Sequence, residues 1–238
     1  MIEKKVSIHQ PSYWPWLGLL AKIAKSDLYV YLDSVDSIKD HYLYRNIFFC
    51  NGESKYLTLP VNYTMGKPIR DLEFLNANWK NDHINKLRNY YRKAPFVNEV
   101  LSKITPFYSI QNQSVADFIL ETMKVSFEVL NINVAIIKSY SLNLTGKKGD
   151  LVLSICKETD ATEYIAGMGS FDYMKEVIPE FEKEGIKISW HKYAHPFYMQ
   201  DPGYPFVPGL ACLDLFFYKG FDDAKEIFWD SVKNEATV

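Results

Sequence analysis

Cysteine and long apolar runs are both scarce in this sequence. Its 238 residues include three cysteines, Cys50, Cys156 and Cys212, which lie far apart and lack the paired spacing of a metal site. Three cysteines do not form an even disulfide framework, so we expect a reduced protein with a cytoplasmic location. No apolar run reaches the roughly 18 residues that a membrane span needs. The N-terminal residues also lack the apolar core of a secretory signal.

The sequence also lacks an excess of charge of either sign. Its formal net charge is −2 at pH 7, so no large positive field is present to attract nucleic acid or an anionic membrane. Neither is therefore expected as the main partner. Aromatic residues, in contrast, make up 16% of the chain. Tyr and Trp join an apolar body to a polar tip, which suits a polar pocket, a Tyr-rich core or a subunit interface, so an oligomer remains open.

The order of the apolar patterns predicts an α/β fold. Residues 6–8, 16–25 and 28–32 indicate a strand, a helix and a second strand, which is how a parallel sheet begins. Asn51-Gly52 supplies the turn of a hairpin between residues 46–50 and 55–60. We expect a mostly parallel sheet flanked by helices, with a small hairpin insertion and a helical C-terminal part, in a single domain over residues 1–238. The alternative is a weak internal boundary at residues 145–150. The remaining elements are expected as helices at 79–93, 114–130, 151–158, 210–218 and 222–232 and strands at 134–137, 163–166 and 187–193.

His9 stands where the first strand ends and the first helix begins. Open α/β sheets bind ligands at the carboxyl ends of their strands, so His9 is a candidate general base or phosphate contact. The alternative is a histidine that bridges to backbone and has only a structural role. Gln10, Lys22 and Arg45 add polar groups to the same part of the sequence.

A second candidate turn is the segment Gly167-Met168-Gly169-Ser170, between an expected strand and an expected helix. Two glycines let backbone amides approach an anion closely. A tight turn without a ligand explains the same glycines.

Cys212 and His195 together suggest a thiol nucleophile that accepts an acyl group as a thioester. Cys212, however, adjoins several apolar residues, so we expect a buried structural thiol. His83 and His191 are expected to be solvated or capping residues. We expect no metal site, because the acidic cluster of the sequence has irregular spacing on a charged loop. That cluster comprises Asp33, Asp36, Asp40 and His41.

The N-terminal segment carries the pattern His-Gln-Pro, an aromatic residue, Pro-aromatic-x-Gly and a helical lysine, and here the chain resembles the WbqC-like family. Matching residues are His9, Gln10, Pro11, Tyr13, Pro15, Trp16, Gly18 and Lys22. The likeness continues at Asp33, Arg45, Asn46, Trp79 and His83, and through residues 91–95, 164–169, 198–200 and 210–220. One departure is Ala211, where the family often has serine, so a hydroxyl role there is in doubt.

This resemblance implies a transferase that forms an amide, acyl or aminoacyl such as glycyl, on the amino group of a nucleotide-linked amino sugar. Its pathway would be bacterial surface polysaccharide, or O-antigen, biosynthesis. The donor is open between acyl-CoA, an acyl carrier thioester and ATP plus an amino acid, so an acyl carrier protein is a candidate partner. The alternative is a non-catalytic sugar-nucleotide-binding or scaffold protein of polysaccharide assembly.

The expected site combines both ends of the chain. His9 and Asp33 are the candidate catalytic residues, with Asp33 as an orienting group or second carboxylate. The candidate substrate-binding residues are Gln10, Tyr13, Lys22, Arg45, Asn46, Gly167, Gly169, Tyr198, Gln200 and Asp214. We expect His9, Lys22 and Arg45 to share one cleft with the last three of these, covered by the loop at residues 198–208.

Overall fold

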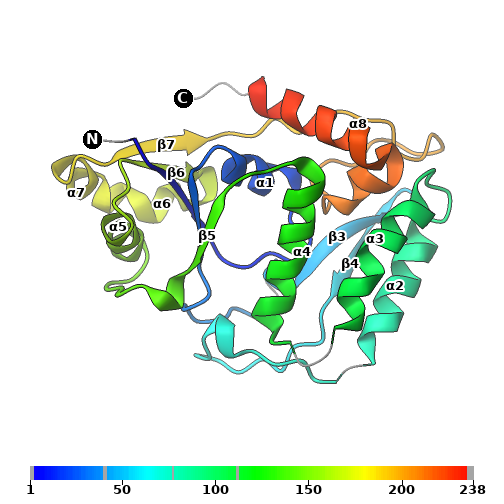
Figure 1. Ribbon diagram of the computed structural model, residues 1–238, viewed down its shortest axis with the longest axis horizontal. Coiled ribbons are helices and arrows are strands. Elements are labelled where there is room, and N and C mark those ends of the chain that lie inside the picture. The colour runs from blue at the N-terminus through cyan, green and yellow to red at the C-terminus, as the bar shows by residue number, and fades with distance from the viewer. Residues whose placement is uncertain (1–2, 40–41, 77, 111–112, 235–238) are drawn as a thin grey trace.

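The computed structural model describes residues 3–39, 42–76, 78–110 and 113–234. Its centre is a parallel five-stranded sheet in the order β5-β2-β1-β6-β7 (Figure 1). The strands are β1 (Lys5–His9), β2 (Leu28–Tyr31), β5 (Ala135–Lys138), β6 (Glu163–Gly167) and β7 (Lys187–His191). The first strand of the chain therefore lies in the middle, and later strands are added to both sides of it. The direction of strand addition reverses between β1 and β6, which makes this the switch point of the sheet.

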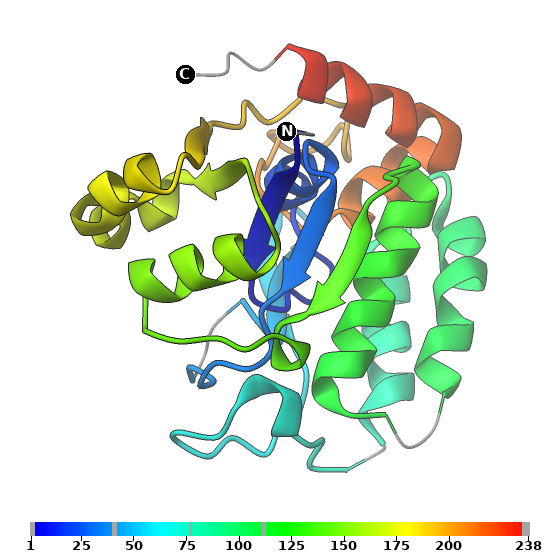
Figure 2. The same cartoon turned by 60° about the vertical axis from the view of Figure 1, so that its left-hand side comes forward.

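Helices cover both faces of the sheet (Figure 2). Alternation along β1 sends Val6 and Ile8 into the apolar layer beneath α5 (Gly149–Glu158), α6 (Phe171–Met174) and α7 (Ile178–Lys183). On the opposite face, Tyr29 and Tyr31 of β2 join a larger core. The helices that contribute to this core include α1 (Leu17–Ala24), α4 (Val115–Leu130) and α8 (Leu213–Lys233). Coverage on both faces explains the apolar runs of the central strands β1, β2 and β6, whereas the edge strands β5 and β7 are less buried.

The hairpin forms a separate two-stranded sheet of β3 (Arg45–Cys50) and β4 (Glu53–Thr58). Its turn has positive φ at both Asn51 and Gly52, as the sequence predicts. Helices α2 (Trp79–Tyr90) and α3 (Val97–Ser109) lie beside the hairpin. The sequence did not predict α3, because Pro106 is a poor residue for a helix interior. Buried Val100, Leu101, Ile104 and Tyr108 hold that helix against the core.

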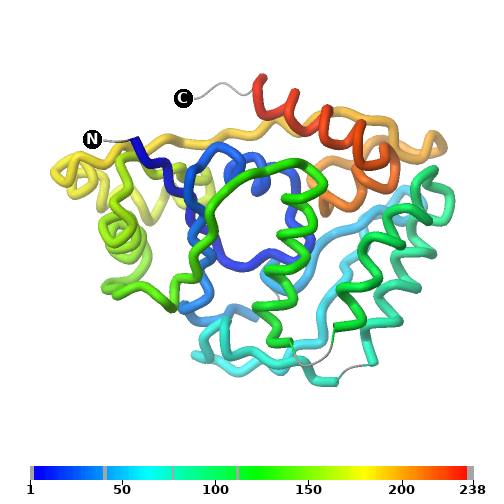
Figure 3. The backbone as a smooth tube through the Cα atoms, in the orientation of Figure 1, coloured from blue at the N-terminus to red at the C-terminus, as the bar shows by residue number. Residues whose placement is uncertain are grey.

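Short 3₁₀ segments complete the fold at η1 (Ile69–Asp71), η2 (Ser139–Ser141), η3 (Met168–Ser170) and η4 (Lys175–Val177). The connection between β7 and α8 runs along one side of the molecule (Figure 3). Two closing helices were expected at residues 210–218 and 222–232. The structure has both, as the two helical segments of α8, which are divided at Gly220, where the backbone is not helical and φ is 71°.

The predicted fold class is confirmed: helices flank a parallel sheet, the hairpin is small, and the C-terminal part is helical. One sheet contains β5 from before residues 145–150 and β6 from after them. Across the described ranges, no helix is both long enough and apolar enough to pass through a bilayer.

Candidate functional site

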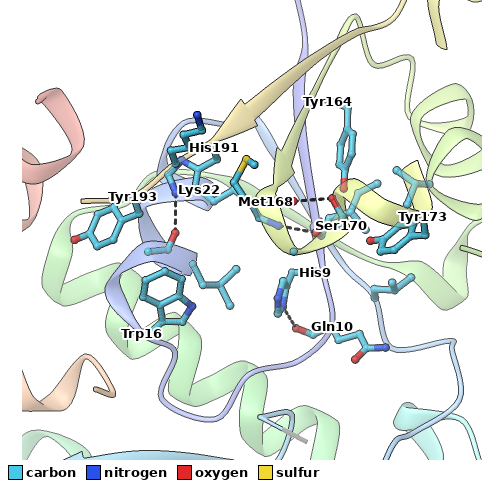
Figure 4. A pocket seen from close by; sticks show the side chains of 18 of the residues that line it. His9, Gln10, Trp16, Lys22, Tyr164, Met168, Ser170, Tyr173, His191 and Tyr193 are labelled. Atoms are coloured by element: carbon cyan, nitrogen blue, oxygen red, sulfur yellow. Dashed lines mark hydrogen bonds between the residues drawn. The ribbon is translucent and has the colours of Figure 1, made fainter. Parts of the chain in front are cut away.

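A pocket of about 800 Å³ opens at the switch point, at the carboxyl ends of β1, β6 and β7 (Figure 4). This volume lies within the usual range for small-molecule sites. Gly167 of β6 pairs with His191 of β7, and Ser7 of β1 pairs with Ile165 of β6. Continuing the second register by two residues brings His9 level with Gly167. The parallel sheet therefore gathers three strand ends from distant parts of the sequence around one space.

His9, the last residue of β1, lines this pocket and is half-buried. Its Nδ1 lies 2.7 Å from the carbonyl oxygen of Gln10. A carbonyl oxygen only accepts hydrogen bonds, so Nδ1 carries the proton. In the neutral ring the lone pair is then on Nε2, which is the form that a general base requires.

Lys22 of α1 also lines the pocket, but it is only 5% exposed. Its long side chain reaches back to the end of β1, where Nζ donates to the carbonyl oxygen of Ile8 at 2.9 Å. Burial lowers the pKa of Lys22 to about 8, so the ammonium is still mostly charged at pH 7. Within the described part of the chain it forms no salt bridge. Among the described residues, no carboxylate therefore balances this buried positive charge.

The charge of the pocket has one sign. Its described lining contains Lys22 and the exposed Lys192, but no aspartate or glutamate. A concave site with cations and without carboxylates attracts an anion such as a phosphate or a diphosphate. Gly167 and Gly169 line the opposite part of the pocket at the end of β6. A Cβ at Gly169 would meet nothing within 4 Å, so the missing side chain leaves open space there.

Aromatic side chains form another wall. Trp16 is 40% exposed and packs edge to face with Tyr193, with ring centroids 5.6 Å apart. His191 lies nearly parallel to Tyr193 and donates from Nε2 to the carbonyl oxygen of Gly18 at 2.9 Å. Burial, followed by the nearby charges of Lys25 and Lys22, lowers the pKa of His191 to about 4, so its ring is neutral at pH 7. Figure 4 shows Trp16 and Tyr193 on one side of the pocket and His9 on the other.

Of the predicted site residues, the structure places five in this pocket: His9, Gln10, Lys22, Gly167 and Gly169. The other predicted residues do not belong to its described lining. They are Tyr13, Asp33, Arg45, Asn46, Tyr198, Gln200 and Asp214.

Asp33 lies at the same edge of the sheet, just past β2, but its carboxylate connects two strand ends. Oδ1 accepts from Ser139 Oγ at 3.0 Å and from the Tyr140 amide at 3.3 Å. Burial raises the pKa of Asp33, although these donors oppose the shift. Asp33 thereby orders the segment that follows β5.

Tyr13, Asn46 and Arg45 lie around the loop between β1 and α1. The Tyr13 hydroxyl is buried between His83 and Tyr108. Asn46 donates from Nδ2 to the carbonyl oxygens of Tyr13 and Trp14, at 3.1 and 2.7 Å. Arg45 lies over the ring of Tyr56 in the hairpin, 4.6 Å from its centroid. Asn46 thus positions the loop that carries Trp16 into the pocket.

Tyr198, Gln200 and Asp214 form a buried network of their own. Asp214 Oδ2 accepts from Tyr198 Oη at 2.7 Å and from Gln200 Nε2 at 2.6 Å. Gln200 also exchanges hydrogen bonds with the backbone of Val207. Burial raises the pKa of Asp214 to about 6. The expected common cleft with His9 is thus not formed, because these polar groups point into the base of their own loop.

The remaining candidates have structural surroundings. Cys212 is fully buried, lies 3.2 Å from Ser126 Oγ, and has its pKa raised to about 12 by burial. The expectation of a solvated His83 is wrong: the ring is 3% exposed and bridges Tyr13 Oη to the carbonyl oxygen of Thr58. Asp40 and His41 lie outside the described residues. Among the residues described, no cluster of three or more potential ligands could hold a metal ion.

The sequence reasoning did not include Trp16, His191, Tyr193, Ser170 or Tyr173 among the site residues, although all of them line the pocket. His191 lay inside the strand expected at residues 187–193, whereas the structure ends β7 at His191, just as β1 ends at His9. The pairing of β6 with β7 was needed to place the two ends together.

A doubly wound parallel sheet with a pocket at its switch point defines an α/β protein with a candidate ligand site. The model of the WbqC-like protein family matches residues 10–226, and the chain belongs to this family. It is similar to the uncharacterized protein Rv1507c of Mycobacterium tuberculosis, with 26% identity over 221 residues, covering 91% of this chain and 94% of the relative. No solved structure matches the chain.

Proposed function

We propose that the switch-point pocket binds a nucleotide-linked amino sugar and that the protein transfers an acyl or aminoacyl group, such as glycyl, to its amino group. The reaction would serve bacterial surface polysaccharide, or O-antigen, biosynthesis. The observation that carries this proposal is a pocket without described carboxylates in which His9 lies near the buried Lys22. Family membership supports the proposal, because the family model covers Gln10 and Lys22 and the resemblance noted in the sequence implies this substrate class.

The diphosphate of the ligand supplies the negative partner that Lys22 does not have among the described residues. A buried ammonium without a counter-ion is unfavourable, and an incoming anion relieves that cost at the moment of binding. Lys22 uses one donor on Ile8 and retains two for the ligand. Exposed Lys192 adds a second positive charge at the rim.

His9 acts on the amine of the sugar. The amine nitrogen attacks the acyl carbonyl carbon, the bond to the leaving group breaks, and His9 Nε2 takes the proton that the nitrogen loses. The hydrogen bond from Nδ1 to Gln10 keeps the ring in the required tautomer. Asp33 stays in this proposal as an orienting group for the sheet edge.

The donor class remains open between acyl-CoA, an acyl carrier thioester and ATP with an amino acid. Each releases a different leaving group, a thiol or a phosphate-containing product, so the donor is identified by the by-product. Delivery as a carrier thioester would make an acyl carrier protein a partner.

The test combines binding with turnover. The protein is screened by thermal shift against UDP-glucosamine, dTDP-4-amino-4,6-dideoxyglucose, CoA esters and ATP, since a ligand of the folded state raises the melting temperature. Sugars that bind are then incubated with acetyl-CoA or with ATP and glycine, and the products are analysed by mass spectrometry. An amide-linked sugar supports the transferase. Binding without any acylated product supports the non-catalytic sugar-nucleotide-binding alternative, and no binding of either sugar rules out both.

A further inference from the structure

Glycine destabilises a helix relative to alanine, so Gly18 in the first turn of α1 needs an explanation. Its backbone is helical, and positive φ, the usual reason for glycine, is not found there. A Cβ at Gly18 would lie 2.1 Å from Cη2 of Trp16 and 2.3 Å from Cζ3. The benzene part of the indole therefore rests directly on the backbone of Gly18. Any larger residue would push the ring out of this position.

The loop that carries Trp16 is fixed at several points. Trp16 forms a β-bridge with Ala211, and the Cys212 amide donates to the carbonyl oxygen of Pro15 at 3.0 Å. Tyr193 holds the indole from the side. The ring is nevertheless 40% exposed, while its neighbours Trp14 and Leu17 are buried. A rigid, partly exposed aromatic ring in a pocket is suited to stacking on a ligand.

We propose that Trp16, seated on Gly18, is the wall on which the amino sugar ring of the ligand stacks. This inference rests on the proposed function, in which the sugar amine lies at His9. Trp16 and His9 line the same pocket (Figure 4), so a sugar ring that stacks its face on the indole can direct an amine at its edge toward His9. Axial C–H groups on that face carry slight positive charge, which matches the negative face of an aromatic ring.

The first part of the test separates the sugar from the nucleotide. Calorimetry measures the affinities of UDP-glucosamine and dTDP-4-amino-4,6-dideoxyglucose, and of the parent diphosphates UDP and dTDP, for the intact protein and for Trp16→Ala. We expect Trp16→Ala to weaken sugar nucleotide binding by roughly five- to tenfold and to leave the parent diphosphate unaffected. The matched control is Tyr56→Ala, another half-exposed aromatic residue, in the hairpin and outside the pocket lining.

The second part uses Gly18→Ala, which should displace the indole without harming the helix. Alanine favours helix over glycine by up to about 1 kcal/mol, so the melting temperature should stay equal or rise while sugar nucleotide affinity falls as in Trp16→Ala. In the double variant the two losses should not add, because both remove the same wall.

The outcomes separate this inference from the proposed function. If Trp16→Ala weakened the binding of the parent diphosphate and of the sugar nucleotide equally, Trp16 would contact the nucleotide base and not the sugar. That result would overturn the inference. So would unchanged affinities in Trp16→Ala and Gly18→Ala. Stacking without acyl transfer would leave the inference intact and contradict the transferase. If the intact protein binds neither sugar nucleotide, both ideas fall.

Discussion

Two histidines that look alike in the sequence have opposite surroundings in the structure. His9 is half-buried and faces the pocket, whereas His83 is 3% exposed and joins two polar groups of the core. Burial, with a smaller effect of Lys86, lowers the pKa of His83 to about 4, so it is a neutral structural residue at pH 7. Substitution of His9 should therefore reduce activity, whereas substitution of His83 should reduce stability.

We expect His9→Ala to reduce acyl transfer by at least about 100-fold, the usual scale for a lost general base. Its unfolding free energy should change by less than about 1 kcal/mol. His83→Ala should instead lower the unfolding free energy by about 2–3 kcal/mol, since it leaves buried partners without hydrogen bonds. Turnover assays and urea unfolding measure both effects. Normal turnover in His9→Ala would remove His9 from the mechanism.

Lys22 predicts how binding depends on pH. Its pKa of about 8 in the empty protein lies below the ordinary value of 10.5, so affinity for UDP should fall by up to about tenfold per pH unit above pH 8. The unfolded chain binds more protons between pH 8 and 10, so this group makes unfolding free energy rise with pH there. Lys22→Met should abolish both trends and stabilise the empty protein by about 1–2 kcal/mol at pH 7.

The exposed Lys192 is the control for this behaviour. Lys192→Met should weaken UDP binding at all pH values and keep the decline above pH 8. A decline that persists in Lys22→Met would show that another group controls it.

The three thiols should differ in reactivity. Cys156 and Cys212 are buried, and burial raises the pKa of each to about 12, whereas Cys50 is partly exposed. We expect one thiol per chain to react with Ellman's reagent in the native protein and three after denaturation. Cys212→Ser should remain active. An acyl adduct trapped on Cys212 would contradict this reading.

At the scale of elements, the loop between β7 and α8 is held by a buried carboxylate in addition to its apolar contacts with the core. Asp214, at the second position of α8, takes hydrogen bonds from Tyr198 and Gln200 of the loop. Its Oδ1 has no hydrogen-bond partner among the described residues. The charge is therefore only partly compensated, which agrees with its raised pKa.

The Asp214 carboxyl group predicts a stability change in mild acid. Its folded pKa of about 6 exceeds the ordinary 3.8, so the folded state binds more protons between these values. Unfolding free energy should fall as pH rises from about 4 to 6, by up to about 3 kcal/mol. Asp214→Asn should flatten this part of the curve, and Asn in place of the exposed Asp222 should not. Equal slopes in the intact protein and Asp214→Asn would refute the assignment.

Local sequence patterns were sufficient to predict most helices and strands, but not which side chains these elements bring together. The His9 turn and the Asn51-Gly52 hairpin could be predicted because neighbouring residues determine a strand end or a tight turn. The Trp16 wall could not be predicted, since it depends on how the indole rests on Gly18 and on Tyr193, which lies just after the distant strand β7. The prediction from polar residues was wrong for Asp214, because it accepts hydrogen bonds from Tyr198 and Gln200 in a network of their own. The local sequence does not distinguish such a buried network from a ligand site.

At the scale of the molecule, one sheet joins segments from both halves of the chain. β1 pairs with β2 on one side and with β6 on the other. Separate fragments 1–146 and 147–238 should each fail to fold, because the first lacks one neighbour of β1 and the second lacks β1 itself. The whole chain should unfold in one thermal transition. Circular dichroism and calorimetry test both points, and a cooperatively folded fragment would reveal an independent unit.

The central place of β1 also has a consequence during synthesis. The Lys4 amide donates to Thr162, 158 residues further along, so one edge of β1 has no partner until β6 has left the ribosome. At roughly 5–20 residues per second, that interval is on the order of ten seconds. An apolar strand with an open edge invites pairing between nascent chains. We therefore expect the yield of the protein in the cell to depend on chaperones more strongly than the stability of the folded protein suggests.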